Sequence, residues 1–335
     1  MARALPRIAI SLGDPSGIGP EVTAAAVRAL RGELSPLVFG DPILFDRHFR
    51  GLELPVVGVD EPLPAGGALV AATHLPAQAA RPGKPAPVAG AAQLAFLEDA
   101  FAAVVRGDAA ALCTAPVSKA QVARFCEGFA GHTEWLEERT GAPRSVMMFD
   151  GARVRVALVT THVPFAELTR LLTPALIAET IRIVHRAMRD DFGIARPRVA
   201  LAALNPHAGE EGLIGDEEVR LLLPALKLAA RAGAPAAGPF PADSVFNRAA
   251  LGQFDVVVAL YHDQGMIPVK LLDTVGLQAA VNVTLGLPIV RTSPDHGVAY
   301  DIAGKGKAKA ESMIAALRLA AKIAARRATR PRGAR

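Results

Sequence analysis

The fold of this chain is decided by one stretch of sequence, Phe254-Asp-Val-Val-Val-Ala-Leu-Tyr-His-Asp-Gln-Gly-Met-Ile-Pro-Val-Lys270. Its apolar segment, Val256 to Leu260, has the length and the β-branched content of a strand buried on both faces. The polar cluster that follows contains Gly265, which permits a tight turn. Ligands of open α/β sheets bind beyond the carboxyl ends of the strands, so the polar side chains after Leu260 are candidates for a binding site.

The same pattern of an apolar strand followed by a histidine occurs at two other places. Val154 to Thr160 is typical of a strand and precedes His162, and Arg198 to Leu204 is typical of a strand and precedes His207. Neutral imidazole is a common ligand of divalent metals, and three protein ligands with open positions are the catalytic pattern. A single histidine after a strand usually caps or turns the chain, and spacing alone does not show convergence. Three in the same context, with His262, favour a metal site.

Composition and length set the class of protein. A chain of 335 residues suggests two domains, and a hydrophobic content of 51% with a mean hydropathy of +0.29 excludes disorder for most of it. The two cysteines, Cys113 and Cys126, are too few for a disulfide framework and fit a reducing compartment. The sequence shows neither a signal-peptide pattern nor an apolar run of membrane-spanning length. We therefore expect a soluble cytoplasmic protein with no membrane partner.

The positive charge raises nucleic acid as a partner. The net charge is +5 with a pI near 9.5, and much of the excess lies between Lys322 and Arg335, in a helix end and basic tail. Aromatic side chains, on which single-stranded bases would stack, are not interleaved with these charges. A non-catalytic nucleic-acid-binding protein would also leave the strand-end histidines unexplained. We expect no nucleic-acid partner and assign the charge to an anionic substrate.

The N-terminal part alternates strands and helices. Arg7 to Leu12 is strand-like and leads into Gly13-Asp-Pro-Ser-Gly-Ile-Gly-Pro-Glu21, whose last two residues suit the first turn of a helix from Val22 to Leu30. Glycines before a helix can let backbone N–H groups approach a phosphate, although a plain strand-to-helix turn explains them equally well. The motif is neither the Rossmann nor the P-loop pattern. Further strands and helices are expected at 37–41, 54–59, 68–71, 93–105, 109–113 and 120–127. This rhythm predicts a mostly parallel sheet.

The rest of the chain adds further candidates. His132 and Thr133 lie at an expected helix start, where Thr133 is either an N-cap or a binding group. Gly238 to Phe246 is expected to be a Pro-bounded loop that holds Asp243. Arg291, at an expected strand end, has the guanidinium fork that binds phosphate or carboxylate at two points.

The segment from His296 to Gly306 resembles the cofactor loop of the isocitrate and isopropylmalate dehydrogenase fold, where a His-Gly…Asp-Ile-Ala-Gly-Lys-Gly run holds adenosine. His296, Gly297 and Asp301 occupy the matching positions. That fold binds NAD or NADP without the G-x-G-x-x-G fingerprint, which this chain lacks.

Taken together, the motifs closely resemble the 4-hydroxythreonine-4-phosphate dehydrogenase family of pyridoxal-phosphate biosynthesis. The motifs that carry the resemblance are Gly13–Glu21, Gly131-His-Thr-Glu134, Thr160-Thr-His-Val-Pro164, Asn205-Pro-His-Ala-Gly209, Pro241-Ala-Asp243, Tyr261-His-Asp-Gln-Gly265 and Val281-Asn-Val-Thr-Leu-Gly-Leu-Pro288. They cover most of the chain in the family's order.

The resemblance implies a fold and a set of site residues. The fold is a two-domain α/β subunit of mostly parallel sheets flanked by helices, with the active site in the cleft between the domains and near the interface of a homodimer. We expect one domain from residues 1–128 with 300–335, and a second from 129–299. The metal ligands fall on His162, His207 and His262, which can come from two subunits. The substrate contacts fall on His132, Thr133, Lys270, Asn282 and Arg291.

The implied reaction is the oxidation of 4-phosphohydroxy-L-threonine at its C3 hydroxyl by NAD or NADP, followed by decarboxylation to 3-amino-2-oxopropyl phosphate. A divalent metal would lower the pKa of the bound alcohol, and either Lys270 or His132 would accept its proton. Asp243 and Asp263 are candidate partners of the histidines, unless they form Asx turns. The residues leave zinc, cobalt, magnesium and manganese open, because imidazoles favour softer ions and substrate oxygens accept harder ones.

Two alternatives remain. The segment from Leu271 to Ala280 lacks a glycine-rich, aromatic spacer found in some vitamin-pathway members, so a related dehydrogenase of 4-phospho-D-threonate or 4-phospho-D-erythronate is possible. A metal-dependent hydrolase with three histidines and a bound water is the rival from another class. That rival leaves the segment from His296 to Gly306 without a role.

Overall fold

The computed structural model describes residues 5–276 and 279–329 of the chain, which forms two compact units. Unit 1 comprises Met1–Ala142 with Leu287–Arg335, and unit 2 comprises Pro143–Gly286. Residues 277–278 of the segment from Leu271 to Ala280, and residues 330–335 of the basic C-terminal stretch, lie outside the described residues. Among the described residues, none of the helices combines the length and apolar character needed to cross a membrane.

Unit 1 is built on a parallel sheet whose strands lie in the order β3-β4-β2-β1-β5-β12. Each neighbouring pair in this order is parallel. The strands are β1 (Arg7–Ser11), β2 (Ser35–Gly40), β3 (Val56–Gly58), β4 (Ala68–Ala71), β5 (Ala111–Thr114) and β12 (Arg291–Pro294). The helices are α1 (Gly19–Ala29), α2 (Pro42–Leu44), α3 (Ala89–Arg106), α4 (Lys119–Val122), α5 (His132–Thr140) and α11 (Glu311–Ala328), with short helical turns at Phe45–Phe49 and Ala77–Ala80. The predicted βαβ alternation is confirmed.

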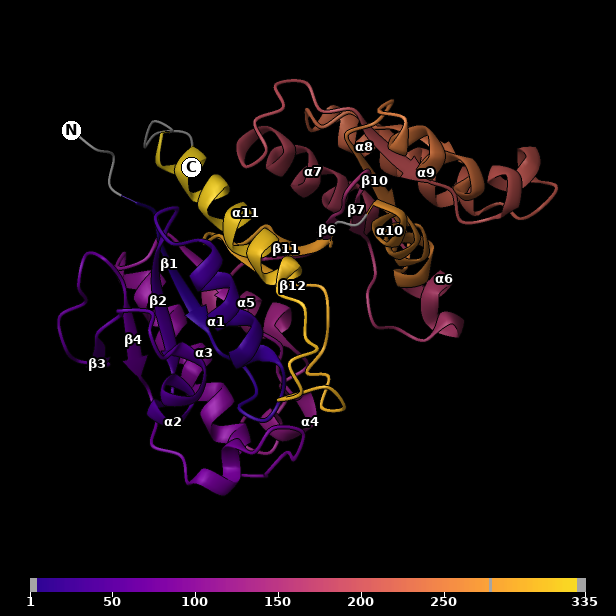
Figure 1. The fold of residues 1–335 in the computed structure, drawn as a ribbon. Coiled ribbons are helices and arrows are strands. Elements are labelled where there is room, and N and C mark those ends of the chain that lie inside the picture. Colours follow the sequence, from indigo (N-terminus) through magenta and orange to yellow (C-terminus); the bar gives the residue numbers. More distant parts are fainter. Residues whose placement is uncertain (1–4, 277–278, 330–335) are drawn as a thin grey trace. The chain divides into compact units, whose positions relative to one another are not determined.

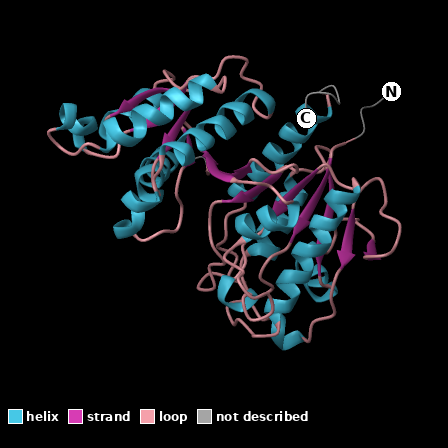
Figure 2. Ribbon diagram, turned by 180° about the vertical axis from the view of Figure 1, so that it is seen from behind, coloured by secondary structure: helices cyan, strands magenta, loops and turns pink. Residues whose placement is uncertain are grey.

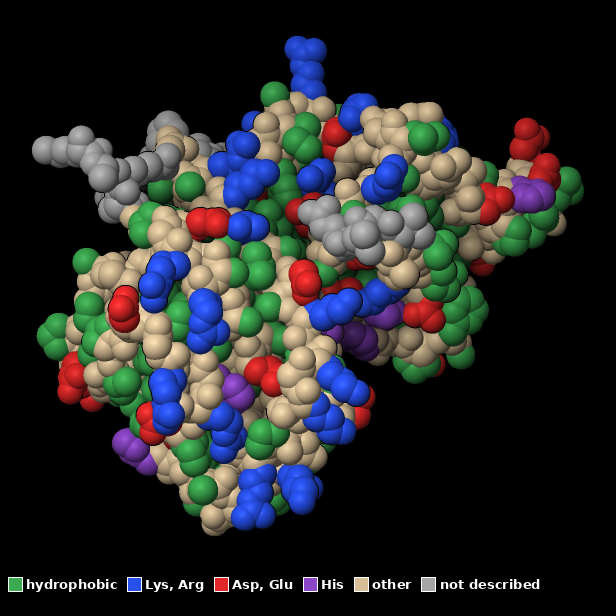
Figure 3. Space-filling model, in the orientation of Figure 1, with side chains coloured by type: hydrophobic (Ala, Val, Ile, Leu, Met, Phe, Trp, Pro, Cys, Tyr) green, Lys and Arg blue, Asp and Glu red, His purple; other side chains and the backbone are tan. Residues whose placement is uncertain are grey.

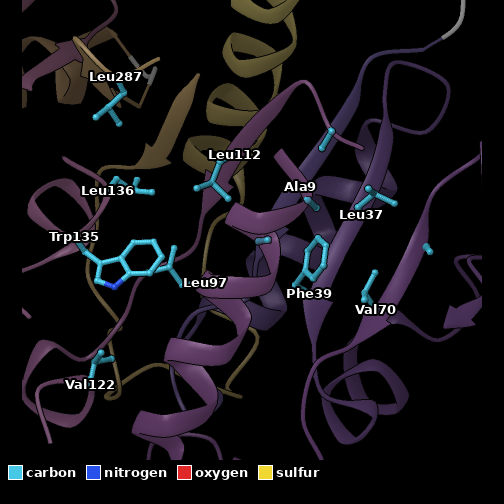
Figure 4. Close-up of a cluster of buried hydrophobic side chains, with 14 of the residues drawn as sticks. Ala9, Leu37, Phe39, Val70, Leu97, Leu112, Val122, Trp135, Leu136 and Leu287 are labelled. Carbon is cyan, nitrogen blue, oxygen red and sulfur yellow. The ribbon is translucent and has the colours of Figure 1, made fainter. Parts of the chain in front are cut away.

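Helices cover both faces of this sheet, as the two ribbon views show (Figures 1 and 2). Helix α3 packs on β1, β2 and β5, and helix α11 packs on β12, β5 and β1. The core on the α3 side is shown in Figure 4, where Trp135 of α5 points toward Leu97 of α3. Strand residues Ala9, Leu37 and Leu112 belong to the same cluster. Burial on both faces is the reason why these strands are apolar runs rather than alternating sequences.

Unit 2 has a mixed sheet in the order β11-β6-β7-β10-β8-β9. The pairs β7–β10, β10–β8 and β8–β9 are parallel, whereas β6 is antiparallel to both β11 and β7. The strands are β6 (Val146–Asp150), β7 (Arg155–Leu158), β8 (Val199–Ala202), β9 (Ala237–Phe240), β10 (Val256–Ala259) and β11 (Val281–Leu285). The helices are α6 (Leu168–Leu171), α7 (Pro174–Asp190), α8 (Leu223–Arg231), α9 (Ala242–Ala250) and α10 (His262–Gly276), with short helical turns at Phe165–Glu167, Pro206–Gly212 and Glu218–Leu222. The mostly parallel α/β class is confirmed.

Some charged side chains form ion pairs on the surface. Arg318 binds Glu33 at 2.7 Å, and Arg198 binds Asp255 at 2.8 Å. Figure 3 shows basic side chains interspersed with acidic and apolar ones over one face of the molecule. The positive surplus on this face is therefore spread out rather than gathered in one stripe.

Four local expectations are corrected by the structure. The expected tight turn around Gly265 is helix α10, which begins at His262 directly after β10. The expected loop from Gly238 to Phe246 is the end of β9 followed by α9, so Asp243 lies in the first turn of a helix. Arg291 begins strand β12 instead of ending a strand. The helix expected from Ala120 to Glu127 is only the single turn α4.

Close packing explains why α10 contains a glycine at its start. A Cβ on Gly265 would lie 2.7 Å from Val156 Cγ1 and 2.8 Å from Leu158 Cδ2, both on the neighbouring strand β7. The absence of a side chain lets the helix approach the sheet immediately after the strand. The residue that seemed to permit a turn therefore sets the distance between helix and sheet.

We predict that Gly265→Ala destabilises the protein. Alanine gains about 1 kcal/mol of helix propensity over glycine, but overpacking a core typically costs about 1–3 kcal/mol. We expect a Tm lowered by a few degrees, measured by thermal unfolding. The matched control is Gly66→Ala, because Gly66 has open space around its Cβ position and a φ outside the left-handed region. A Gly265→Ala variant as stable as the wild type would contradict this account of the glycine.

Candidate functional site

The three histidine-bearing strand ends of unit 2 lie side by side. Strand β10 is flanked by β7 on one side and by β8 on the other, and all three run parallel. Their carboxyl ends therefore meet at one edge of the sheet, where ligands of open α/β sheets bind. His162 follows β7, His207 follows β8, and His262 follows β10.

Two of these histidines face each other. The ring centroids of His162 and His262 are 5.6 Å apart, with an angle of 39° between the rings. Both line a cavity of about 270 Å³, together with Thr161, Val163, Phe165, Leu168, Tyr261 and Asp263. His262 Nδ1 is 2.7 Å from Asp263 Oδ1, a contact that orients the ring, so that Nε2 would be the ligand atom of a bound metal.

His207 stands apart from this pair. It lies in the turn Pro206–Gly212, where His207 to Glu211 all have positive φ, and its Nδ1 is 3.0 Å from Glu210 Oε2. Within the described part of the chain, no three His, Cys, Asp or Glu side chains gather closely enough to hold a metal ion. One chain therefore brings two of the three predicted imidazoles together, with the third at the neighbouring strand end.

Gln264 is one of the polar side chains after Leu260, and its structural role was not predicted. This buried side chain accepts from Leu260 N at 2.7 Å and donates to Ala203 O at 2.7 Å. It thereby joins the end of β10 to the end of β8. The sequence signal for this role was its place immediately after a buried strand.

The other predicted residues of unit 2 are spread over three elements. Lys270 lies exposed on α10, eight residues after His262, which corresponds to about 12 Å along a helix. Asn282 lies on β11, and its buried Oδ1 accepts no hydrogen bond from the described residues. Asp243 is exposed in the first turn of α9. Of the two candidate aspartates, Asp263 contacts His262.

Unit 1 contains a second group of predicted residues around a buried cation. Arg291 is 3% exposed, and its Nη2 donates to Thr114 Oγ1 at 2.8 Å. Burial lowers the pKa of Arg291 to about 10, so the guanidinium still carries its charge at neutral pH. A buried guanidinium is expensive to desolvate, so its retention favours a site for an anion.

His132 lies beside this cation at the N-terminus of α5. Burial, together with the nearby charges of Arg291 and Lys119, holds the pKa of His132 well below its ordinary value. Its Nε2 is buried and makes no hydrogen bond within the described residues. The N-cap of α5 is Gly131, which has no side chain to cap the first turn, so Thr133 is not the N-cap.

Lys119 was not predicted as a site residue. Its Nζ lies 3.3 Å from the position that a Cβ on Gly131 would occupy, so the glycine makes room for the ammonium group. The signal was available, because Thr114-Ala-Pro-Val-Ser-Lys119 follows a strand in a βαβ unit. Two cations, a neutral imidazole and a helix N-terminus form a site suited to a phosphate or carboxylate.

The predicted nucleotide residues lie in the loop between β12 and α11. The Nδ1 atom of His296 is 3.1 Å from Gly297 O, and its buried Nε2 makes no hydrogen bond among the described residues. The Cβ position of Gly297 faces open space, and Asp301 is exposed. The buried Nε2 of His296 and the open space beside Gly297 are compatible with the binding of a flat heterocycle.

Known proteins match this chain over nearly its whole length. A family model described as "Pyridoxal phosphate biosynthetic protein PdxA" matches residues 33–320. The 4-hydroxythreonine-4-phosphate dehydrogenase of Paracoccus denitrificans is 44% identical over 325 residues, which cover 96% of this chain and 98% of the relative. A crystal structure of a 4-hydroxythreonine-4-phosphate dehydrogenase from Burkholderia phymatum is 38% identical, with a TM-score of 0.78, over 96% of this chain and 99% of that one. A terephthalate 1,2-cis-dihydrodiol dehydrogenase from Burkholderia xenovorans is 30% identical, with a TM-score of 0.67, over 95% and 98% of the two chains.

We predict that His132 is neutral at pH 7 and that its pKa rises when an anion binds beside it. Histidine NMR, with His132→Asn for assignment, should show a titration well below the usual value of about 6.5. Addition of inorganic phosphate should raise this pKa, because the dianion offsets the neighbouring cations. Arg291→Met should raise the pKa without phosphate and weaken the phosphate effect. A His132 signal that titrates near 6.5 in the free protein would refute the buried-cation account.

The same shift predicts the pH dependence of stability. Because the folded-state pKa of His132 is lowered, the unfolded chain binds this proton first. The contribution of His132 is therefore complete above about pH 6.5 and is lost as the pH falls. Urea unfolding between pH 7 and pH 5 should show a shallower loss of stability in His132→Asn than in the wild type. An equal loss in both proteins would contradict the assignment.

Proposed function

The chain belongs to the PdxA family of pyridoxal phosphate biosynthetic proteins, and from this membership we propose that it is a 4-hydroxythreonine-4-phosphate dehydrogenase. The resemblance inferred from the motifs is confirmed by the family match. The reaction would oxidise the C3 hydroxyl of 4-phosphohydroxy-L-threonine to a ketone, with the hydride passing to NAD or NADP. The resulting β-keto acid would lose CO₂ and leave 3-amino-2-oxopropyl phosphate. The observation that carries the proposal is the buried Arg291 beside the neutral His132 at the start of α5.

Unit 1 would bind the phosphate group of the substrate. Arg291 donates to Thr114 from the start of β12, and the ammonium group of Lys119 lies beside Gly131. The first turn of α5, with His132 and Thr133, adds backbone N–H groups and the positive end of the helix. These groups would hold the substrate in one orientation, which is a large part of the catalytic effect.

Unit 2 would hold the divalent metal through His162 and His262, with His207 as the third ligand. The 5.6 Å ring separation and the Asp263 contact of His262 support the pair. We propose that the set is completed in a homodimer, because one chain leaves His207 apart from the pair. When bound, the metal lowers the pKa of a coordinated alcohol and stabilises the negative charge that develops on its oxygen. Zinc, cobalt, magnesium and manganese remain the candidates.

Lys270 is the better candidate for the proton acceptor. It lies in unit 2 on the same helix as His262, whereas His132 lies in unit 1 beside the two cations that suit a phosphate. Asn282 has a buried acceptor oxygen without a partner among the described residues, which fits the binding of a substrate ammonium group. In this assignment, Lys270 moves the proton and Asn282 orients the amino acid end.

Two alternatives to this function concern the substrate and the class of reaction. The related terephthalate dihydrodiol dehydrogenase has a name that gives another substrate, so similarity alone does not identify the substrate of this chain. The alternative substrates 4-phospho-D-threonate and 4-phospho-D-erythronate must therefore be compared directly with 4-phosphohydroxy-L-threonine. A metal-dependent hydrolase would not need the loop that carries His296 and Gly297. That loop favours the dehydrogenase.

We predict that the metal-loaded protein reduces NAD or NADP with 4-phosphohydroxy-L-threonine in preference to 4-phospho-D-threonate and 4-phospho-D-erythronate. Absorbance of the reduced nicotinamide measures the rate, and a chelator should abolish it. His262→Ala should lower the metal content, measured by elemental analysis, and the rate by at least a hundredfold. The exposed His74→Ala is the matched control and should change neither. Preference for a phospho-sugar acid would correct the substrate, and absence of turnover with all three would overturn the proposed function.

We also predict that Arg291→Lys lowers kcat/KM for the phosphorylated substrate by at least tenfold, because lysine cannot reproduce the two-point contact of a guanidinium. The loss should fall mainly on KM, measured by steady-state kinetics. Arg318→Lys, on the surface of the same unit, is the control and should be silent. An unchanged KM in Arg291→Lys would remove Arg291 from phosphate binding.

A further inference from the structure

The motif Gly13–Glu21 has no role in the reaction described above, yet it touches the proposed nucleotide loop at three points. The Tyr300 hydroxyl donates to Asp14 Oδ2 at 2.5 Å, and Ile18 N donates to Val298 O at 2.9 Å. The backbone N–H of Gly304 donates to the carboxylate of Glu21. We infer that this motif is the anchor of the nucleotide loop, residues 295–306, and that Tyr300 is the positioning residue through which it fixes that loop. This inference rests on the proposed function for the identity of the ligand.

One glycine of the motif, Gly17, is required by the contact with the loop. A Cβ on Gly17 would lie 2.8 Å from Val298 O, so a side chain there would push the loop away. A Cβ on Gly19 would lie 2.5 Å from Leu12 O, so that glycine serves the close packing of α1 on the end of β1. The motif therefore brings its backbone against a second loop, and the plain turn explanation does not account for Gly17.

The acceptor of the Tyr300 hydrogen bond is a fully buried carboxylate. Asp14 is 0% exposed, and burial raises its pKa despite the hydrogen bonds that favour its charged form. Its side-chain donors are neutral, namely the Tyr300 hydroxyl and Gln93 Nε2 at 3.2 Å, and Ser16 N adds a backbone donor at 2.8 Å. A buried carboxylate held only by neutral donors is a costly arrangement. Its presence is explained if it fixes one geometry of the attached loop.

A network behind Asp14 gives the anchor its rigidity. Gln93, also 0% exposed, donates to Gln121 Oε1 at 2.9 Å and accepts from Ser118 N at 2.7 Å. Gln121 in turn donates to the Tyr300 hydroxyl at 3.3 Å. The Tyr300 hydroxyl therefore takes part in two hydrogen bonds of this network, one with Asp14 and one with Gln121. Burial and Asp14 raise the pKa of Tyr300, which stays a hydroxyl donor at every physiological pH.

Tyr300 is well placed to set the nucleotide contacts. It lies four residues after His296, whose buried Nε2 makes no hydrogen bond within the described residues, and immediately before the exposed Asp301. Its hydroxyl reaches the buried Asp14, while its two flanking segments carry the predicted contacts. Loss of its hydroxyl should therefore loosen both segments without removing any group that touches the reacting atoms.

The test is Tyr300→Phe, which keeps the ring and deletes the hydroxyl. A hydrogen bond to a charged group is worth enough to change binding about tenfold. We expect the Kd of NAD or NADP, measured by calorimetry, and the corresponding KM to rise about tenfold while kcat changes less than twofold. Inorganic phosphate, for which we propose a site at Arg291, should keep its affinity. Amide hydrogen exchange in residues 295–306 should become faster.

Two further variants sharpen the result. Asp14→Asn removes the negative charge of the acceptor and should weaken nucleotide binding in the same direction. The double variant should be no worse than Tyr300→Phe alone, because the hydroxyl that Asp14 binds is then already absent. Ser35→Ala is the control, since Ser35 is a buried hydroxyl of the same unit that donates to Ala65 O at 2.8 Å away from the loop. It should change neither nucleotide affinity nor exchange in 295–306.

The outcomes separate the inference from the proposed function. Unchanged nucleotide affinity together with unchanged exchange in Tyr300→Phe would overturn the anchor. If the wild-type protein binds neither NAD nor NADP, the proposed function fails and takes the nucleotide role of Tyr300 with it. Exchange in 295–306 then still decides whether the motif anchors the loop.

Discussion

Parallel strand pairing is the constraint on which the rest of this structure depends. In unit 1 each neighbouring pair of strands is parallel, and in unit 2 the three strands β7, β10 and β8 are parallel neighbours. Parallel strands place their carboxyl ends at the same edge, so side chains distant in the sequence meet there. The same pairing buries the strands on both faces and requires helices to cover them. The candidate site is therefore a consequence of the sheet, and local loops only complete it.

Buried charge is the second feature that runs through the molecule. Arg291 and Asp14 are both inside unit 1. The Thr114 hydroxyl accepts from Arg291, and a tyrosine hydroxyl, a glutamine amide and a backbone N–H donate to Asp14. Apolar residues of similar volume would stabilise the core more than either buried charge does. Arg291 lies where an anionic substrate would bind, and Asp14 lies behind the loop assigned to the nucleotide. Stability is given up at both places for a fixed geometry.

Most of the strands were visible in the sequence because burial on both faces leaves continuous apolar runs, as in Val256 to Leu260. Strand β6 was not predicted, because the run from Ser145 to Asp150 is short and is joined to β7 by a hairpin instead of a helix. Gly265 was predicted in a turn and lies in helix α10, because a glycine after a strand permits a turn and a closely packed helix equally well. Only the neighbouring side chains of Val156 and Leu158 distinguish the two.

The candidate site, like the fold, was predictable from the sequence only in part. The sequence by itself determined the class of fold, the family and the residue types at the strand ends, because these depend on local pattern and on motif order. The tertiary structure alone decided that His162 faces His262 while His207 stays apart, that Gln264 joins two strand ends, and that Tyr300 reaches Asp14 across 286 residues. Such pairings depend on which strands become neighbours and on what each side chain meets when it is buried. Those are properties of the packed chain, and no short stretch of sequence contains them.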